Sequence, residues 1–135
     1  YGGGSVSPTE TLDSLRAAGV KTKATSPDFA LTHEKGMVID GSTAFITTAN
    51  FTLSALGDSK STKNREYGII DTNPQDVQTV IAIFNADWNR SSLQQIDDPN
   101  LVVSPINSRT DFLKLIGSAK KSLLIEAEEM QDAQV

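Results

Sequence analysis

The residues best suited to chemistry in this chain surround its one histidine. His33 and Lys35 lie two positions apart in residues 31–39, a segment whose apolar pattern predicts a β-strand. Alternate side chains of a strand point to the same side of the sheet. The imidazole and the ammonium should therefore project together from one face.

A tight turn should bring the chain back to this pair. Asp40-Gly41 is a strong signal for a hairpin turn, and residues 43–48 should form the returning strand, with Asn50 at its end. An imidazole can attack phosphorus, while an ammonium and an amide can hold anionic oxygens as charge builds. The stretch predicts a site for phosphoryl chemistry that needs no metal or other cofactor.

A plainer interpretation exists for the pair taken alone, with His33 as an ordinary strand histidine and Lys35 as a solvent-facing lysine. The full spacing favours chemistry, because it resembles the signature of the phospholipase D superfamily. The elements of that signature are a histidine, one residue, a lysine, four residues, an aspartate, six residues, three small residues and an asparagine, here His33, Lys35, Asp40 and Asn50. The resemblance covers residues 8–98 and includes an acidic position, Glu66, before an apolar strand.

The resemblance implies a role for each matching residue. His33 would be the nucleophile that forms a phosphohistidine, or the general acid that protonates the leaving group. Lys35 and Asn50 would bind phosphate oxygens, and Glu66 would orient the imidazole through a hydrogen bond. Asp40 would brace the turn, and it ranks below the other residues as a participant in the chemistry.

Two positions depart from the family pattern. Thr48 stands where the family usually has serine, and its hydroxyl could still donate to a phosphate oxygen of the substrate. Thr47 stands where glycine is usual. That departure puts in doubt the close backbone approach that glycine allows.

The number of histidines limits what the chain can do by itself. The family's mechanism uses two such motifs, with one histidine as nucleophile and the other as acid and base, and this sequence has one. We expect residues 1–98 to be one catalytic lobe, incomplete at its N-terminus, and residues 99–135 to open a second lobe. The alternatives are a nuclease-like homodimer and a catalytically incomplete half that serves as a structural or binding module.

These residues require an α/β framework, which we expect to be a mixed β-sheet flanked by helices. Ser7, Pro8 and Glu10 predict a capped helix that Gly19 ends. A long helix should begin near Pro74, and its apolar stripe extends to Trp88. The remaining expected elements are a strand over 20–25, a short helix over 50–56, a buried strand over 67–71, a strand over 101–104, a helix from 108 and a strand over 122–127.

Composition excludes few classes of substrate or binding partner. The chain has a net charge of −5 and no cysteine, and it contains no apolar run of the roughly 18 residues that a membrane span needs. Acidic chains are poor general binders of nucleic acid, so a phospholipid is favoured over a nucleic acid as the phosphodiester substrate. The local basic cluster of Lys60, Lys63 and Arg65 is interpreted as a solvated loop in preference to a phosphate-attracting rim. The compartment stays open among bacterial cytoplasm, envelope and secretion.

Overall fold

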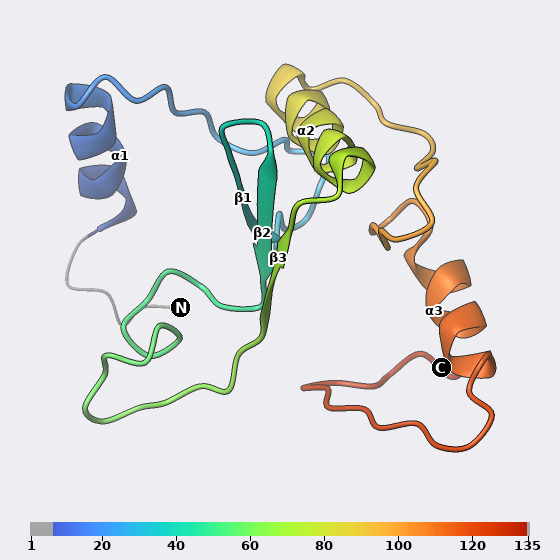
Figure 1. Cartoon of the computed structure of the whole chain (residues 1–135). Helices are drawn as coiled ribbons and strands as arrows, with labels where there is room; N and C mark the ends of the chain where they lie inside the picture. The colour runs from blue at the N-terminus through green and yellow to red at the C-terminus, as the bar shows by residue number, and fades with distance from the viewer. Residues whose placement is uncertain (1–6, 135) are drawn as a thin grey trace. The chain divides into compact units, whose positions relative to one another are not determined.

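The computed structural model describes residues 7–134 and has the α/β composition that the sequence predicts (Figure 1). Three strands and three helices follow one another within these described residues. Their bounds are α1 Pro8–Ala17, β1 Lys35–Ile39, β2 Thr43–Thr47, β3 Gly68–Asp71, α2 Pro74–Asn89 and α3 Ser108–Gly117. In the described residues both strand pairings are antiparallel, so the expected mixed sheet is an antiparallel one.

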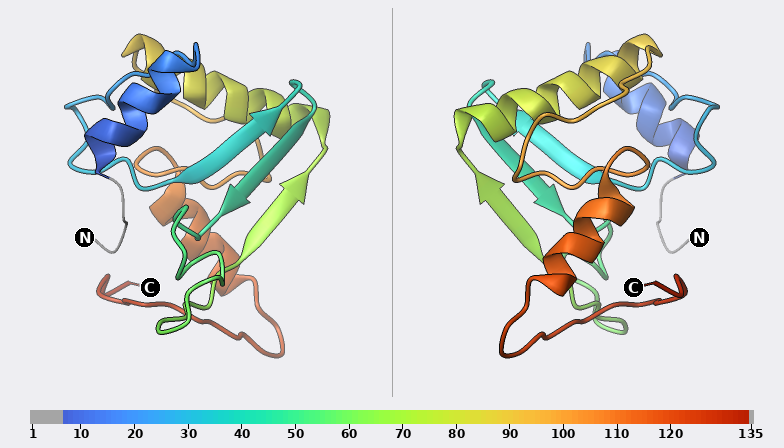
Figure 2. Two further views of the ribbon diagram at one scale, coloured as in Figure 1. Left: turned by 90° about the vertical axis from the view of Figure 1, so that its left-hand side faces the viewer. Right: turned by 90° about the vertical axis from the view of Figure 1, so that its right-hand side faces the viewer.

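The hairpin that carries the histidine motif forms as predicted (Figure 2). β1 pairs antiparallel with β2, in a register that places Lys35 opposite Thr47. The turn between them has φ of 51° at Asp40 and 65° at Gly41. Hairpin turns favour such left-handed positions because they match the twist of the strands. Aspartate tolerates this conformation better than most residues, which agrees with a bracing role for Asp40.

One face of the sheet is covered and the other is open. β3 adds to the free edge of β2, and α2 packs against β1 and β2. Ala44 and Val77 are buried between the sheet and α2. Alternation along the strands turns Met37 and Ile70 to the opposite face, where Ile70 is 75% exposed. The strand over 67–71 was predicted to be buried, and that prediction is wrong. Ile69, on the side of α2, and Ile70, on the other side, are both exposed, because α2 packs on β1 and β2.

Three further strands of the sequence-based prediction do not form. The chain is not in a β-strand at residues 20–25, 101–104 and 122–127. An alternating pattern makes a strand only where a neighbouring backbone accepts its hydrogen bonds, and no described segment pairs with these three. Gly19 does end α1, with φ of 82°.

The short helix expected over residues 50–56 is replaced by turns. The amide N–H of Thr52 donates to the Asn50 carbonyl at 2.8 Å, and the Thr52 hydroxyl accepts from the Ala55 N–H at 3.3 Å. This is the bond of a helix N-cap, and the Leu56 N–H donates to the Thr52 carbonyl at 2.9 Å, which completes a single helical turn. Gly57 follows with φ of 84°, a conformation that ends helices, so the turn does not continue.

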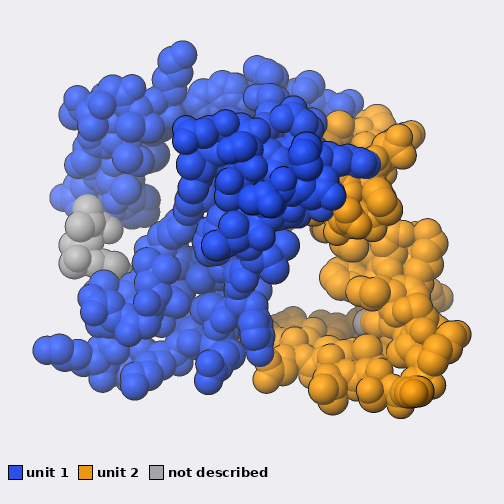
Figure 3. All heavy atoms as spheres, in the orientation of Figure 1, with its two compact units in different colours: residues 1–92 blue, residues 93–135 orange. Residues whose placement is uncertain are grey.

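The chain divides into two compact units, residues 1–92 and residues 93–135 (Figure 3). The first contains α1, the sheet and α2, and the second contains α3. In the second unit, Arg109 Nε donates to Asp132 Oδ2 at 2.7 Å, and this ion pair lowers the pKa of Asp132. All residues of the histidine motif lie in the first unit.

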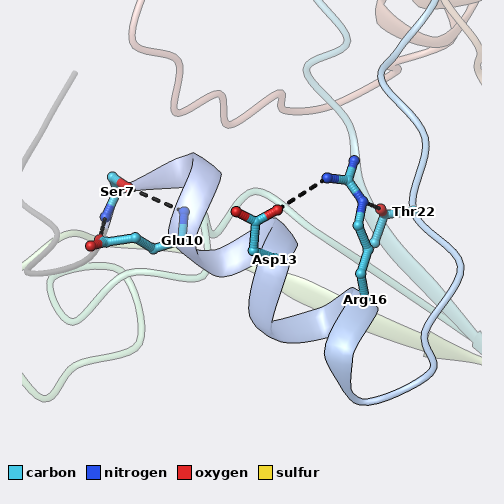
Figure 4. Close-up of polar contacts among 5 residues, drawn as sticks. All are labelled: Ser7, Glu10, Asp13, Arg16 and Thr22. Atoms are coloured by element: carbon cyan, nitrogen blue, oxygen red, sulfur yellow. Dashed lines mark hydrogen bonds and ion pairs between the residues drawn. The ribbon is translucent and has the colours of Figure 1, made fainter.

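The start of α1 shows that local sequence signals decide its position (Figure 4). The Glu10 N–H donates to Ser7 Oγ at 3.2 Å, and the Ser7 N–H donates to Glu10 Oε2 at 2.9 Å. This is the predicted capping box, and the hydrogen bonds from Ser7 lower the pKa of Glu10. Near the other end, Arg16 donates to Asp13 and Thr22.

The contact between β2 and β3 leads to a stability prediction. A Cβ on Gly68 would lie 2.9 Å from Cε2 of Phe45, whereas one on Gly36 would meet only the Phe45 carbonyl at 3.5 Å. Gly68→Ala should lower the free energy of unfolding by about 1–3 kcal/mol through overpacking. Gly36→Ala is the matched control and should change it by less than about 1 kcal/mol. Urea unfolding measures both, and equal midpoints for the two variants would contradict the predicted clash.

Candidate active site

His33 and Lys35 lie side by side at the start of β1. The Lys35 Nζ is 3.3 Å from Nδ1 and 3.2 Å from Nε2 of the His33 ring. His33 precedes the first strand residue and is exposed, whereas Lys35 begins the strand and is half-buried. The two side chains are therefore in contact, although His33 lies before the strand that was expected to carry both residues. Since the ammonium reaches both ring nitrogens, it also lies where it would meet a phosphate bound to the imidazole.

Asn50 lies in the same cleft as this pair. The cleft has a volume of about 340 Å³ and is lined by His33, Lys35 and Asn50 together with Leu31 and Phe51. Because Lys35 is opposite Thr47 in the hairpin register, the chain that leaves β2 passes directly beside His33. The pairing of β1 with β2 thus gathers an imidazole, an ammonium and an amide, as the sequence predicted.

Glu66 is held by other partners than the predicted one. Its carboxylate accepts from the Thr48 hydroxyl at 2.6 Å and from Asn64 Nδ2 at 3.1 Å. These bonds, together with the positive charge of Lys35, lower the pKa of Glu66 below its ordinary value. Among the hydrogen bonds of the described residues, none joins Glu66 to His33. Glu66 is therefore an ionised group whose charge acts on Lys35, which in turn contacts the imidazole.

Thr47 and Thr48 join the end of β2 to the residues that precede β3. The Thr48 hydroxyl donates to Glu66 and accepts from the Tyr67 N–H at 3.0 Å, and the Thr48 N–H donates to the Tyr67 carbonyl at 2.9 Å. The Thr47 hydroxyl donates to the same carbonyl at 2.8 Å. The sequence suggested that the Thr48 hydroxyl would donate to substrate. In the structure this hydroxyl donates its hydrogen bond to Glu66.

Asp40 lies away from the cleft. It occupies the turn at the opposite end of β1 from Lys35, and five strand residues span roughly 17 Å. The cleft is not lined by Asp40. The structure therefore supports a role for Asp40 in the turn and does not bring it together with the other predicted site residues.

Sequence reasoning missed the two apolar side chains of the cleft. Leu31 and Phe51 are exposed and flank the polar residues. The sequence could have indicated Phe51 as a cleft residue, because it directly follows Asn50. No group of three His, Asp or Glu side chains suited to a metal ion is found within residues 7–134.

A larger cavity, of about 550 Å³, lies between α2 and the segment that leads into β1. The rings of Phe84 and Trp88 stack there with centroids 5.8 Å apart, and Lys23 Nζ lies 5.8 Å from the Trp88 ring centroid while donating to the Trp88 carbonyl. These contacts tie α2 to the segment before the strand. His33 does not line this cavity.

Comparison with known proteins agrees with the geometry of the cleft. A family model described as "Cardiolipin synthase, PLD-like domain" matches residues 3–88, which is more than half of the chain. The chain belongs to the phospholipase D-like family. The match includes the whole hairpin, the cleft residues, Glu66 and nearly all of α2. No curated protein and no solved structure matches this phospholipase D-like chain.

The bond from Thr48 to Glu66 leads to a prediction about pH. Thr48→Val in the phospholipase D-like lobe should raise the pKa of Glu66 towards its ordinary value, because it removes the hydrogen bond that lowers it most. Carbon-detected NMR titration of the carboxyl group measures this shift. Thr62→Val is the matched control, since Thr62 bonds Ser54 and Ser59 and not Glu66, and it should leave the pKa of Glu66 unchanged.

The same bond sets the sign of the pH effect on stability. A carboxyl with a lowered pKa stabilises the fold above its unfolded pKa, and this stabilisation disappears as pH falls through the folded pKa. Thr48→Val should therefore destabilise the lobe most at neutral pH and least in acid. A loss of stability that grows as pH falls would contradict this account.

Proposed function

We propose that this phospholipase D-like lobe provides half of an active site that cleaves or exchanges a phosphodiester bond through a phosphohistidine at His33. The observation that carries the proposal is the shared cleft of His33, Lys35 and Asn50. The family match supports phosphodiester chemistry in general. Phospholipid is the favoured substrate, and a nucleic acid is the less favoured one.

The first step would transfer the phosphoryl group to the histidine. Lys35 and Asn50 hold the non-bridging oxygens while a neutral ring nitrogen of His33 attacks phosphorus. A nitrogen–phosphorus bond forms, the bond from phosphorus to the leaving oxygen breaks, and that oxygen receives a proton from a separate acid. Water or an alcohol then attacks phosphorus, its proton passes to the conjugate base of that acid, and the nitrogen–phosphorus bond breaks to release His33. Water gives hydrolysis, and an alcohol gives transfer to a new ester.

The acid must come from outside this cleft. The sequence has one histidine, and an imidazole bonded to phosphorus cannot also protonate the leaving group. We propose that a second lobe of the same protein, which residues 99–135 would begin, supplies this acid. A second copy of this chain, facing the first through its His33 cleft, is the alternative source.

Glu66 and Lys35 would position the imidazole by charge. The ammonium of Lys35 lies within reach of His33 and acts on Glu66, whose lowered pKa keeps it ionised. The carboxylate would hold the ammonium in place where it meets the anionic phosphoryl oxygens of the substrate. Glu66 would therefore act on His33 through Lys35.

A substrate that needs no acid tests the nucleophile by itself. Bis(p-nitrophenyl) phosphate releases a stable phenolate without protonation, so the lobe should give a burst of nitrophenolate and an acid-labile phosphohistidine. His33→Ala should abolish both. Lys35→Met should slow the burst by about 10²–10³-fold, the usual cost of removing one oxyanion donor. Lys60→Met is the matched control and should leave the burst intact. Absence of a burst from the folded chain would favour the alternative of a structural or binding half.

Turnover of an ordinary phosphodiester tests the missing acid. A dilute, monomeric sample of the chain should show little turnover, because the general acid step is typically worth about 10²–10⁴-fold. Rates should be measured over a concentration series beside His33→Ala. A rate that rises with the square of concentration would favour the homodimer over a two-lobe protein. Efficient turnover by the monomer, abolished in His33→Ala, would show that the two-histidine argument is wrong.

A further inference from the structure

The connection between β2 and β3, residues 48–67, leaves the sheet beside the cleft and is called the β2–β3 loop here. Both views in Figure 2 show it extending beyond the ends of the two strands. The paired backbone of Thr48 and Tyr67 closes its base. Since β1 begins opposite Thr47, the loop and the His33 cleft occupy the same end of the hairpin.

Hydrogen bonds between polar groups hold the outer part of the loop together. Thr62 Oγ1 bonds the hydroxyls of Ser54 at 2.5 Å and Ser59 at 3.1 Å. The Asp58 N–H donates to the Leu53 carbonyl at 2.9 Å, and the Asn64 N–H donates to the Ser54 carbonyl at 3.3 Å. The loop therefore has a defined shape that its apolar side chains do not create.

Those apolar side chains lie outside. Phe51, Leu53 and Leu56 are 63%, 60% and 62% exposed. Large apolar side chains that stay exposed while the polar groups of the loop bond one another are unusual for a surface loop, and exposed apolar groups close together mark an interaction site. Phe51 also lines the cleft that holds His33. The apolar surface of the loop is thus continuous with the candidate active site.

The charge of the loop differs from that of the chain. Lys60, Lys63 and Arg65 are all exposed, and Asp58 and Glu66 are the acidic side chains of the segment. Glu66 is engaged with Thr48 and Asn64 at the base of the loop. The outer part is therefore cationic on a chain whose net charge is −5. Cations that flank exposed apolar groups complement an anionic lipid surface.

We propose that the β2–β3 loop docks this lobe on an anionic lipid surface, with its three apolar side chains entering the interface and its three cations facing the headgroups. The docking proposal depends on the proposed function in one respect, which is that the docked loop would present lipid phosphates to His33. A lipid fits better than a nucleic acid, because base stacking needs aromatic side chains. The exposed aromatic side chains of the loop are Phe51 and Tyr67, at its two ends, whereas Leu53 and Leu56 offer no stacking surface.

Vesicle co-sedimentation tests the proposal without any turnover. The chain should bind vesicles made of equal parts phosphatidylglycerol and phosphatidylcholine, and bind pure phosphatidylcholine much more weakly. Replacing Lys60, Lys63 and Arg65 with Gln should weaken binding to the anionic vesicles about fivefold per cation. Replacing Phe51, Leu53 and Leu56 with Ser should weaken binding by on the order of 100-fold. Circular dichroism checks that each variant keeps its fold.

Two further variants separate the possible outcomes. Ile70→Thr removes an exposed apolar side chain from β3 and should bind vesicles as the unmodified chain does; a loss equal to that of the loop variant would overturn the proposal in favour of general adhesiveness. His33→Ala should also bind normally, so failure of the catalytic proposal leaves this one standing. Tighter binding to single-stranded DNA than to anionic vesicles, or a chain dimer that the loop variant dissociates without vesicle binding, would overturn it.

Discussion

The antiparallel pairing of β1 with β2 is the constraint on which the rest of the site depends. His33 and Asn50 are far apart along the chain, and only the register that sets Lys35 opposite Thr47 brings them into one cleft. A slip of one residue would turn Lys35 to the face that α2 covers and would bury an ammonium there. The left-handed turn at Asp40 and Gly41 prevents this slip, because it fixes the point at which the chain reverses. A residue remote from the cleft therefore controls the geometry inside it.

The departures from the family pattern have a structural use in this chain. Glycine at position 47 would permit close backbone approach, whereas the Thr47 hydroxyl bonds the Tyr67 carbonyl and accepts from the Ala49 N–H. Together with Thr48, it fastens the start of β3 to the end of β2. This attachment brings Glu66, the residue before Tyr67, within reach of Thr48 and within the influence of Lys35. Thr47 and Thr48 thus hold Glu66 close enough to Lys35 for the charge of the lysine to lower the pKa of the Glu66 carboxyl group.

Local signals in the sequence predicted the elements whose stabilising contacts are also local. The capping box at Ser7, the turn at Asp40, and α2 with its apolar stripe all appear where the sequence indicated. The strand over 20–25 and the burial of residues 67–71 depend on partners distant in sequence, and neither pattern carries information about whether such a partner is present. In the site, spacing predicted the trio of His33, Lys35 and Asn50. The Thr48–Glu66 bond was out of reach, because a side chain's choice among several acceptors depends on geometry that spacing does not determine.

Because the cleft is open to water, its chemistry would depend on what the neighbouring β2–β3 loop binds. His33 is exposed, and a unit charge about 4 Å from an anionic oxygen is worth about 1 kcal/mol in bulk water but about 4 kcal/mol at an effective dielectric of 20. Lys35 would therefore hold a phosphoryl transition state several times more strongly once water is displaced from the cleft. A lipid surface held by Phe51 and its neighbours would displace that water from one side, and a second lobe that brings the acid would displace it from the other. Docking and catalysis would then be coupled through the dielectric around one lysine, since both act on the same interaction.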